Sequence, residues 1–231
     1  MSTATRSDNA TLGIVASNVL TLLTAWWQDW PLVLMLWPYW CQSLVIGWYA
    51  RKRILALGKF STEGFRINDQ AVLPTQETQR RTANFFAVHY GLFHLVYFFF
   101  LVVMSAMTGP AADAGGGVQS VAPSFGRLRG SDFLLILGLS IAFWFSHRAS
   151  FREHVEADLR REPNIGTLMF VPYLRVIPMH LTIILGMGMG EGLGRLLFGG
   201  LKTVADVLMH KIEHRWLQGA TASKPLPRVV D

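Results

Sequence analysis

Long apolar segments are the feature that most constrains what this chain can fold into. A helix that crosses a bilayer needs about 20 mostly apolar residues. Four stretches of the 231 residues meet this requirement, a fifth meets it with Arg175 and His180 inside, and a sixth is more polar. The sequence therefore predicts an all-α, polytopic membrane helical bundle with about six transmembrane helices, at residues 10–27, 31–50, 83–107, 131–146, 169–189 and 191–209.

The composition agrees with a membrane protein and excludes other classes. Charged residues make up 16% of the chain, whereas soluble domains usually carry about 25%. The single cysteine, Cys41, excludes a disulfide scaffold and a zinc site built from cysteines. The 21 Lys and Arg exceed the 15 Asp and Glu, and we expect this excess to lie in cytoplasmic loops. The predicted partner is therefore the lipid bilayer and not a nucleic acid.

Basic residues alternate between the connections of the predicted spans. Residues 51–82 are rich in Lys and Arg, whereas the outer loop at 108–130 has only Arg127 and Arg129. Because positively charged loops stay in the cytoplasm, both termini are predicted to be cytoplasmic. The predicted organisation is an N-terminal tail (1–9), a single transmembrane domain (10–216) with cytoplasmic loops 51–82 and 147–168 and the outer loop 108–130, and a C-terminal tail (217–231).

The third predicted span carries two histidines at different depths. At 1.5 Å per residue, His89 lies about 9 Å and His94 about 16 Å from the cytoplasmic end. Tyr90, His94 and Tyr97 fall on one helical face, which can point into the bundle. Gly91 is expected to let a neighbouring helix approach closely. Ionisable side chains inside a span are often functional, and interhelical hydrogen bonding is their alternative role.

The fifth predicted span is expected to be a broken helix. Pro172 and Pro178 flank Arg175. Each proline removes a helical hydrogen bond, so Pro178 should free the carbonyl of Leu174. Arg175 stays charged and needs an acid, free carbonyls or an anionic lipid headgroup as a partner. We expect an ion pair with Asp206, and the functional alternative is a clamp for an anion or a headgroup.

The sixth predicted span places polar residues at helical spacing. Lys202, Asp206, His210 and His214 follow one another at intervals of four, which gives one stripe on the helix. Asp206 and the two histidines could supply metal ligands from one face, whereas Lys202 and Asp206 could form a plain ion pair. Together with Gln42 of the second span, this stripe predicts a polar cavity that opens to the cytoplasm.

Several motifs resemble those of a known family. They are His89-Tyr-Gly-Leu-Phe-His94, Pro178-Met-His180, Tyr39-Trp40 with Gln42, and Leu201-Lys-Thr-Val-Ala-Asp206 with His210 and His214. Over roughly residues 31–214, the chain resembles an uncharacterised family of small, polytopic bacterial inner-membrane proteins. The resemblance implies a multi-pass location in the bacterial inner membrane and supports the polar positions, but it supplies no reaction.

The leading hypothesis is that the cavity binds a divalent metal, whose identity the sequence leaves open. Any catalysis would be metal-assisted chemistry on a lipidic substrate, and haem is the weaker form of this hypothesis. The proposed metal ligands are a subset of His89, His94, His180, Asp206 and His210, supported by Arg175, Gln42 and Tyr90 around them.

Two further hypotheses stay open. In the first, the chain is a non-catalytic scaffold or an accessory subunit of a membrane protein complex, and its polar residues are interhelical contacts. Its docking surface would be the tryptophan-rich outer face, which otherwise anchors the chain at the lipid interface. These tryptophans are Trp26, Trp27, Trp30, Trp37 and Trp40. In the second, the polar residues line a proton or solute pathway, which no internal repeat supports.

Overall fold

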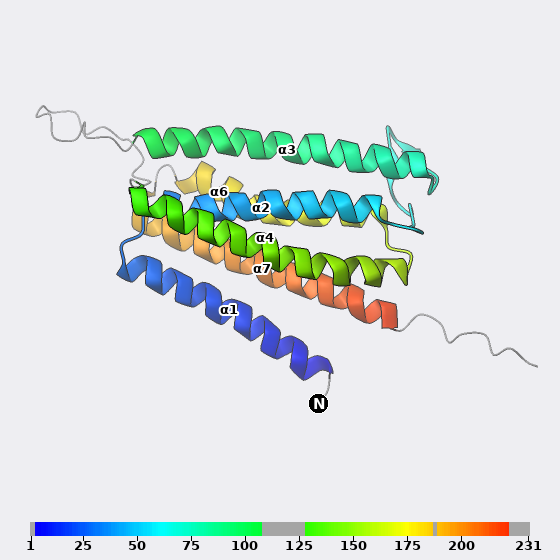
Figure 1. Ribbon diagram of the computed structural model, residues 1–231, viewed down its shortest axis with the longest axis horizontal. Helices are drawn as coiled ribbons and strands as arrows, with labels where there is room; N and C mark the ends of the chain where they lie inside the picture. Colours follow the sequence, from blue (N-terminus) through cyan, green and yellow to red (C-terminus); the bar gives the residue numbers. More distant parts are fainter. Residues whose placement is uncertain (1–2, 108–127, 187–188, 222–231) are drawn as a thin grey trace, which may run out of the picture.

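The computed structural model describes residues 3–107, 128–186 and 189–221, which fold into helical rods running back and forth along one axis (Figure 1). A small hairpin, β1 (Arg66–Ile67) and β2 (Gln70–Ala71), lies in the connection between the second and third rods. The structure thus confirms an all-helical architecture. The helices are α1 (Thr3–Trp27), α2 (Leu32–Leu55), α3 (Gln76–Met107), α4 (Gly130–Leu159), α5 (Ile165–Phe170), the 3-10 helix η1 (Val171–Arg175), α6 (Val176–Gly186) and α7 (Gly190–Thr221).

Helix α2 is the centre of the bundle. It contacts α3, α4, α5, η1, α6 and α7, whereas α1 packs against α7 at the edge (Figure 1). The first turns of α2 bury Leu32, Val33 and Leu36 almost completely. Further along α2, Gly47 lets Tyr90 of α3 come so close that any Cβ at this position would collide with the ring. The helix that allows this close approach is therefore α2, and the Cβ position of Gly91 faces open space instead.

Three segments of the described chain are long and apolar enough to cross a membrane, namely Gln76–Ala106, Gly130–Leu159 and Ile165–Leu185. The apolar part of α1, Thr11–Trp27, is shorter, and α2 and α7 do not reach the same apolarity. The third segment combines α5, η1 and α6 into one rod. The structure therefore supports a membrane protein, while six spans and cytoplasmic termini stay predictions. The predicted outer loop lies mostly outside the described residues, at 108–127.

Arg195 fastens α7 to the turn between α1 and α2. Its Nη1 donates to Oδ1 of Asp29 at 2.9 Å and to the carbonyls of Trp30 and Ala25 at 3.0 and 3.3 Å. Because Ala25 belongs to the last turn of α1, the buried arginine also offsets the negative end of this helix dipole. The charge of Arg195 in the apolar part of α7 thus has a structural explanation.

The tryptophans near the turn between α1 and α2 differ in their exposure. Trp26 and Trp27 are 57% and 86% exposed, as an interface anchor or a docking surface requires. Trp37 and Trp40 are partly buried between α2 and α3, where their Nε1 atoms donate to Ser105 Oγ and to the His94 carbonyl. Only part of the predicted tryptophan-rich surface is therefore available to lipid or to a partner.

A cluster of ion pairs joins the C-terminal ends of α2 and α4. Asp158 is 2% exposed and binds Arg53 of α2 through two hydrogen bonds, and Arg161 at 2.8 Å. A buried carboxylate is tolerated when it is paired and hydrogen-bonded in this way. Because α4 continues to Leu159, much of the predicted cytoplasmic loop 147–168 is helical, and it carries Asp158 to this position.

Candidate functional site

The break in the fifth predicted span is present and places Arg175 at a junction. Residues 171–175 form a 3-10 turn between α5 and α6, with Pro172 near its start and Pro178 in the first turns of α6. The hydroxyl of Tyr39 donates to the Arg175 carbonyl at 2.8 Å. The carbonyl that a neighbouring helix satisfies is therefore that of Arg175, one residue beyond the predicted Leu174.

Arg175 is paired with Asp206, as the sequence predicted. Nη1 of Arg175 lies 3.4 Å from Oδ1 of Asp206, and both side chains are mostly buried. Lys202 Nζ lies 2.6 Å from Oδ2 of the same carboxylate, one helical turn away. Asn18 of α1 donates to Asp206 at 3.1 Å and accepts from Lys202 at 2.7 Å. Four side chains from α1, η1 and α7 thus form one charged network with two cations and one carboxylate.

A polar cavity of about 260 Å³ adjoins this network, and we call it the α1 cavity. It brings together four of the predicted site residues, Gln42, Arg175, Asp206 and His210. Ser17 and Asn18 of α1 complete its polar wall. The sequence analysis missed Asn18, although an asparagine inside the apolar segment 11–27 was a usable signal.

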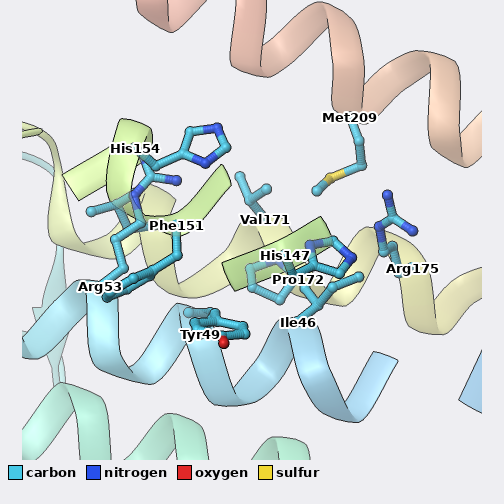
Figure 2. A pocket seen from close by; sticks show the side chains of 12 residues that line it. Ile46, Tyr49, Arg53, His147, Phe151, His154, Val171, Pro172, Arg175 and Met209 are labelled. Carbon is cyan, nitrogen blue, oxygen red and sulfur yellow. The ribbon is translucent and has the colours of Figure 1, made fainter. Parts of the chain in front are cut away.

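A second cavity lies on the other side of Arg175, between α2, α4, η1 and α7, and we call it the arginine cavity (Figure 2). Its volume is about 100 Å³. Four side chains that are cationic or can become so line it, namely Arg53, His147, His154 and Arg175. No Asp or Glu of the described residues lines it. The Nε of Arg175 is buried and has no hydrogen-bond partner among the described residues.

The remaining predicted site histidines lie elsewhere, toward α3 and α6. His89 Nδ1 is 2.9 Å from the Tyr173 hydroxyl, and His180 Nδ1 is 3.0 Å from the Tyr97 hydroxyl. Both histidines are exposed and line an apolar groove of about 300 Å³ between the two helices. Each can be neutral, because a phenol satisfies one ring nitrogen.

His94 is separate from both of these histidines. It is 1% exposed, and its ring stacks on Tyr90 with the ring centroids 4.3 Å apart. A carbonyl only accepts, so Nδ1 carries a hydrogen and donates it to the Tyr90 carbonyl at 2.8 Å. Tyr97 contacts the rings of both His94 and His180. The inward stripe of Tyr90, His94 and Tyr97 is confirmed, since all three are at most 3% exposed.

The five proposed metal ligands therefore divide between two sides of the broken helix. His89, His94 and His180 lie toward α3 and α6, whereas Asp206 and His210 line the α1 cavity. Within residues 3–107, 128–186 and 189–221, no three His, Cys, Asp or Glu side chains gather closely enough to hold a metal. A site made from all five ligands is not formed in this conformation, and metal binding stays a prediction.

Comparison with known proteins places the chain in a family. Residues 1–223 match the Family of unknown function (DUF6498). The chain belongs to this family. No curated protein and no solved structure matches it. The match to DUF6498 extends over all the described helices, and both cavities around Arg175 lie within it. An uncharacterised family, expected from the motifs, is thus confirmed, and the chemistry must be argued from the site.

Proposed function

We propose that this DUF6498 protein is an integral protein of the bacterial inner membrane that binds a phosphate-type anion in the arginine cavity. The observation that supports this most strongly is the kind of side chain that lines the cavity. Arg53 and Arg175 line it with two histidines, and the carboxylates that pair with the two arginines, Asp158 and Asp206, do not line it. Arginine presents a planar fork of donors that matches phosphate oxygens in pairs.

The charges around Arg175 support the same proposal. Arg175 and Lys202 share the single carboxylate of Asp206. Charge at membrane depth is costly unless it is paired, so a bound anion would complete the balance of this cluster. Arg175 can take such a ligand without losing Asp206, because it pairs with this carboxylate through Nη1 and its guanidinium has five donor hydrogens.

The room in the cavity is suitable for a small group. A cavity needs about 10–15 Å³ of water-accessible space for one water molecule. At about 100 Å³, the arginine cavity holds several waters or one phosphate-sized group. His147 and His154 can each donate a ring hydrogen to such a group.

The test is phosphate binding to the purified full-length chain in detergent, measured by calorimetry. We expect Arg175→Gln to weaken binding by about tenfold or more, since a hydrogen bond to a charged group contributes about 1.5–3 kcal/mol. Asp206 keeps Lys202 and Asn18 in this variant, so the protein should still fold. The matched control is Arg81→Gln, an exposed arginine of α3 paired with Glu77.

If the folded wild-type protein does not bind phosphate, or if both variants bind equally, the anion proposal is wrong. A folded chain without any ligand would favour the scaffold hypothesis, in which the exposed Trp26 and Trp27 serve as a docking surface.

The topology has its own test. The start of α1 and the end of α7 lie at the same end of the bundle as the connection from α2 to α3 (Figure 1). Reporter fusions after residues 50, 110 and 231 should therefore read inside, outside and inside. An outside C-terminus would mean that α7 does not span.

The metal hypothesis continues in a reduced form. Asp206 and His210 both line the α1 cavity with Gln42, whereas the groove that His89 and His180 share is apolar. A metal there would have to displace Lys202, whose Nζ lies 2.6 Å from the carboxylate. Elemental analysis of the purified protein decides this, because the hypothesis requires about one equivalent per chain.

A further inference from the structure

The arginine cavity has walls of two kinds. Its polar side chains are those of Arg53, Arg175 and the two histidines, as described above. Its other wall is apolar and includes Ile46, Val171 and Met209 (Figure 2). The rings of Tyr49 and Phe151 extend this apolar wall, with their centroids 5.1 Å apart. A site for free phosphate gains nothing from such a wall, whereas a ligand with an apolar part buries that part against it.

The cavity is also lined by α4, a helix that is apolar enough to cross a membrane. In the described part of the chain, α4 packs against α2 and has no extensive contact with α7. Nevertheless, His147 and Phe151 of α4 and Met209 of α7 line the same cavity, so it lies where these two helices diverge (Figure 2). No residue of the most apolar stretch of α4 is buried in the protein, so lipid is expected to cover this helix.

We propose that the ligand of the arginine cavity is a membrane lipid that ends in a phosphate monoester. This inference rests on the proposed anion binding and adds the source of the anion. The phosphate lies between Arg53 and Arg175, and the apolar chain passes Phe151 and leaves between α4 and α7. A phosphate monoester carries about −1.5 to −2 charges and three terminal oxygens at pH 7. It can therefore bind both arginines, whereas a diester offers one charge and two such oxygens.

The experiment compares four probes on the full-length chain in detergent, with binding measured by the rise in thermal stability and by native mass spectrometry. The probes are phosphatidic acid (a lipid monoester), phosphatidylglycerol (a lipid diester), glycerol 3-phosphate (the headgroup without chains) and inorganic phosphate. We expect phosphatidic acid to bind about tenfold or more tightly than each of the others, and Arg175→Gln to remove its preference over phosphatidylglycerol.

The outcomes separate the two proposals. Equal binding of glycerol 3-phosphate and phosphatidic acid would keep the anion proposal and overturn the lipid proposal. Equal binding of the diester and the monoester lipids would also overturn the lipid proposal as stated. Failure of all four probes with a folded protein would overturn both proposals.

A pair of variants on α4 tests the apolar wall itself. Phe151→Ser removes an apolar side chain from the wall and leaves every charged group in place. Phe145→Ser is the matched control, because Phe145 is 61% exposed on the same helix and does not line the cavity. Phe151→Ser should weaken phosphatidic acid binding several-fold and leave glycerol 3-phosphate binding unchanged. Equal effects of the two variants on phosphatidic acid would overturn the lipid proposal.

Discussion

The two sides of the broken helix solve the problem of polar groups at membrane depth in different ways. Toward α1 and α7 the side chains are charged, and Asp206 is shared by Arg175, Lys202 and Asn18. Toward α3 the side chains can all be neutral, and His89 and His180 each share a hydrogen bond with a tyrosine. We call these the charged side and the neutral side.

This difference indicates which of the two sides is expected to bind a ligand. On the neutral side, His89 and His180 each have a tyrosine as partner, and the buried Nε2 of His94 has no partner among the described residues. On the charged side, two cations meet one carboxylate, and Arg175 retains a buried donor without a partner among the described residues. An incompletely balanced cluster next to a cavity is a stronger indication of ligand binding than a satisfied pair of rings.

The largest effect should come from the charged side. Asp206→Asn leaves Arg175 and Lys202 without their shared carboxylate. Breaking a buried ion pair by removing one partner costs about 3–5 kcal/mol, so the free energy of unfolding in detergent should fall by about this amount. Arg175→Gln should partly restore it. Additive effects of the two changes in the double-mutant cycle would show that the two residues do not interact.

The second largest effect should come from the close packing of α2 against α3 on the neutral side. Gly47→Ala places a Cβ against the ring of Tyr90, whose hydroxyl donates to the Ser43 carbonyl at 3.0 Å. Overpacking of this kind costs about 1–3 kcal/mol of unfolding free energy. Gly91→Ala is the matched control, because no atom comes within 4 Å of its Cβ position. Equal stability of the two variants would indicate that α2 and α3 are less closely packed than described.

The third effect concerns the junction between the two sides. Tyr39→Phe removes the hydroxyl that donates to the Arg175 carbonyl and changes nothing else in shape. Leaving a buried acceptor without its hydrogen bond costs about 1–2 kcal/mol. We expect thermal unfolding of this variant at a lower temperature, with anion binding weakened because Arg175 is less firmly placed. Unchanged stability would mean that water replaces the hydroxyl at this carbonyl.

The sequence predicted much of the charged side because its spacing is local. Lys202 and Asp206 are one helical turn apart, so their pairing follows from the 3.6-residue period. The Arg175–Asp206 pair followed from depth and from the cost of unpaired charge. The two prolines that flank Arg175 predicted a broken helix, and the structure has a 3-10 turn at residues 171–175. Helical spacing, the effect of proline on a helix and the cost of unpaired charge in a bilayer are all general rules, so they can be applied to the sequence alone.

The arrangement of helices around the break could not be predicted from these properties. The sequence predicts how deep His94 lies in its span, but depth does not say which side of a helix faces which neighbour. In the structure Tyr97 contacts both rings, and the cavity that the sequence predicted is divided between two sides. His154 lies within the predicted cytoplasmic loop 147–168, yet the extension of α4 to Leu159 brings it into the wall of the arginine cavity.

The smallest effect should come from the exposed histidines of the neutral side, and it bears on the metal hypothesis. His89 and His180 are exposed in the bundle and each makes one hydrogen bond to a tyrosine. Interhelical hydrogen bonds in membrane proteins contribute about 0.6 kcal/mol on average. His89→Ala and His180→Ala should therefore each lower the free energy of unfolding by less than about 1 kcal/mol.

If these histidines are only hydrogen-bonding partners, the metal content of the purified protein is unchanged in both variants. If either histidine is a ligand, the metal content falls from about one equivalent and the loss of stability is larger, because metal binding stabilises the folded chain by its own binding free energy. Elemental analysis of the two variants beside the wild-type protein separates these results, with His154→Ala as a histidine variant outside the neutral side. A sharp loss of metal in His180→Ala alone would show that the neutral side binds a ligand after all, and the contrast between the two sides would then be wrong.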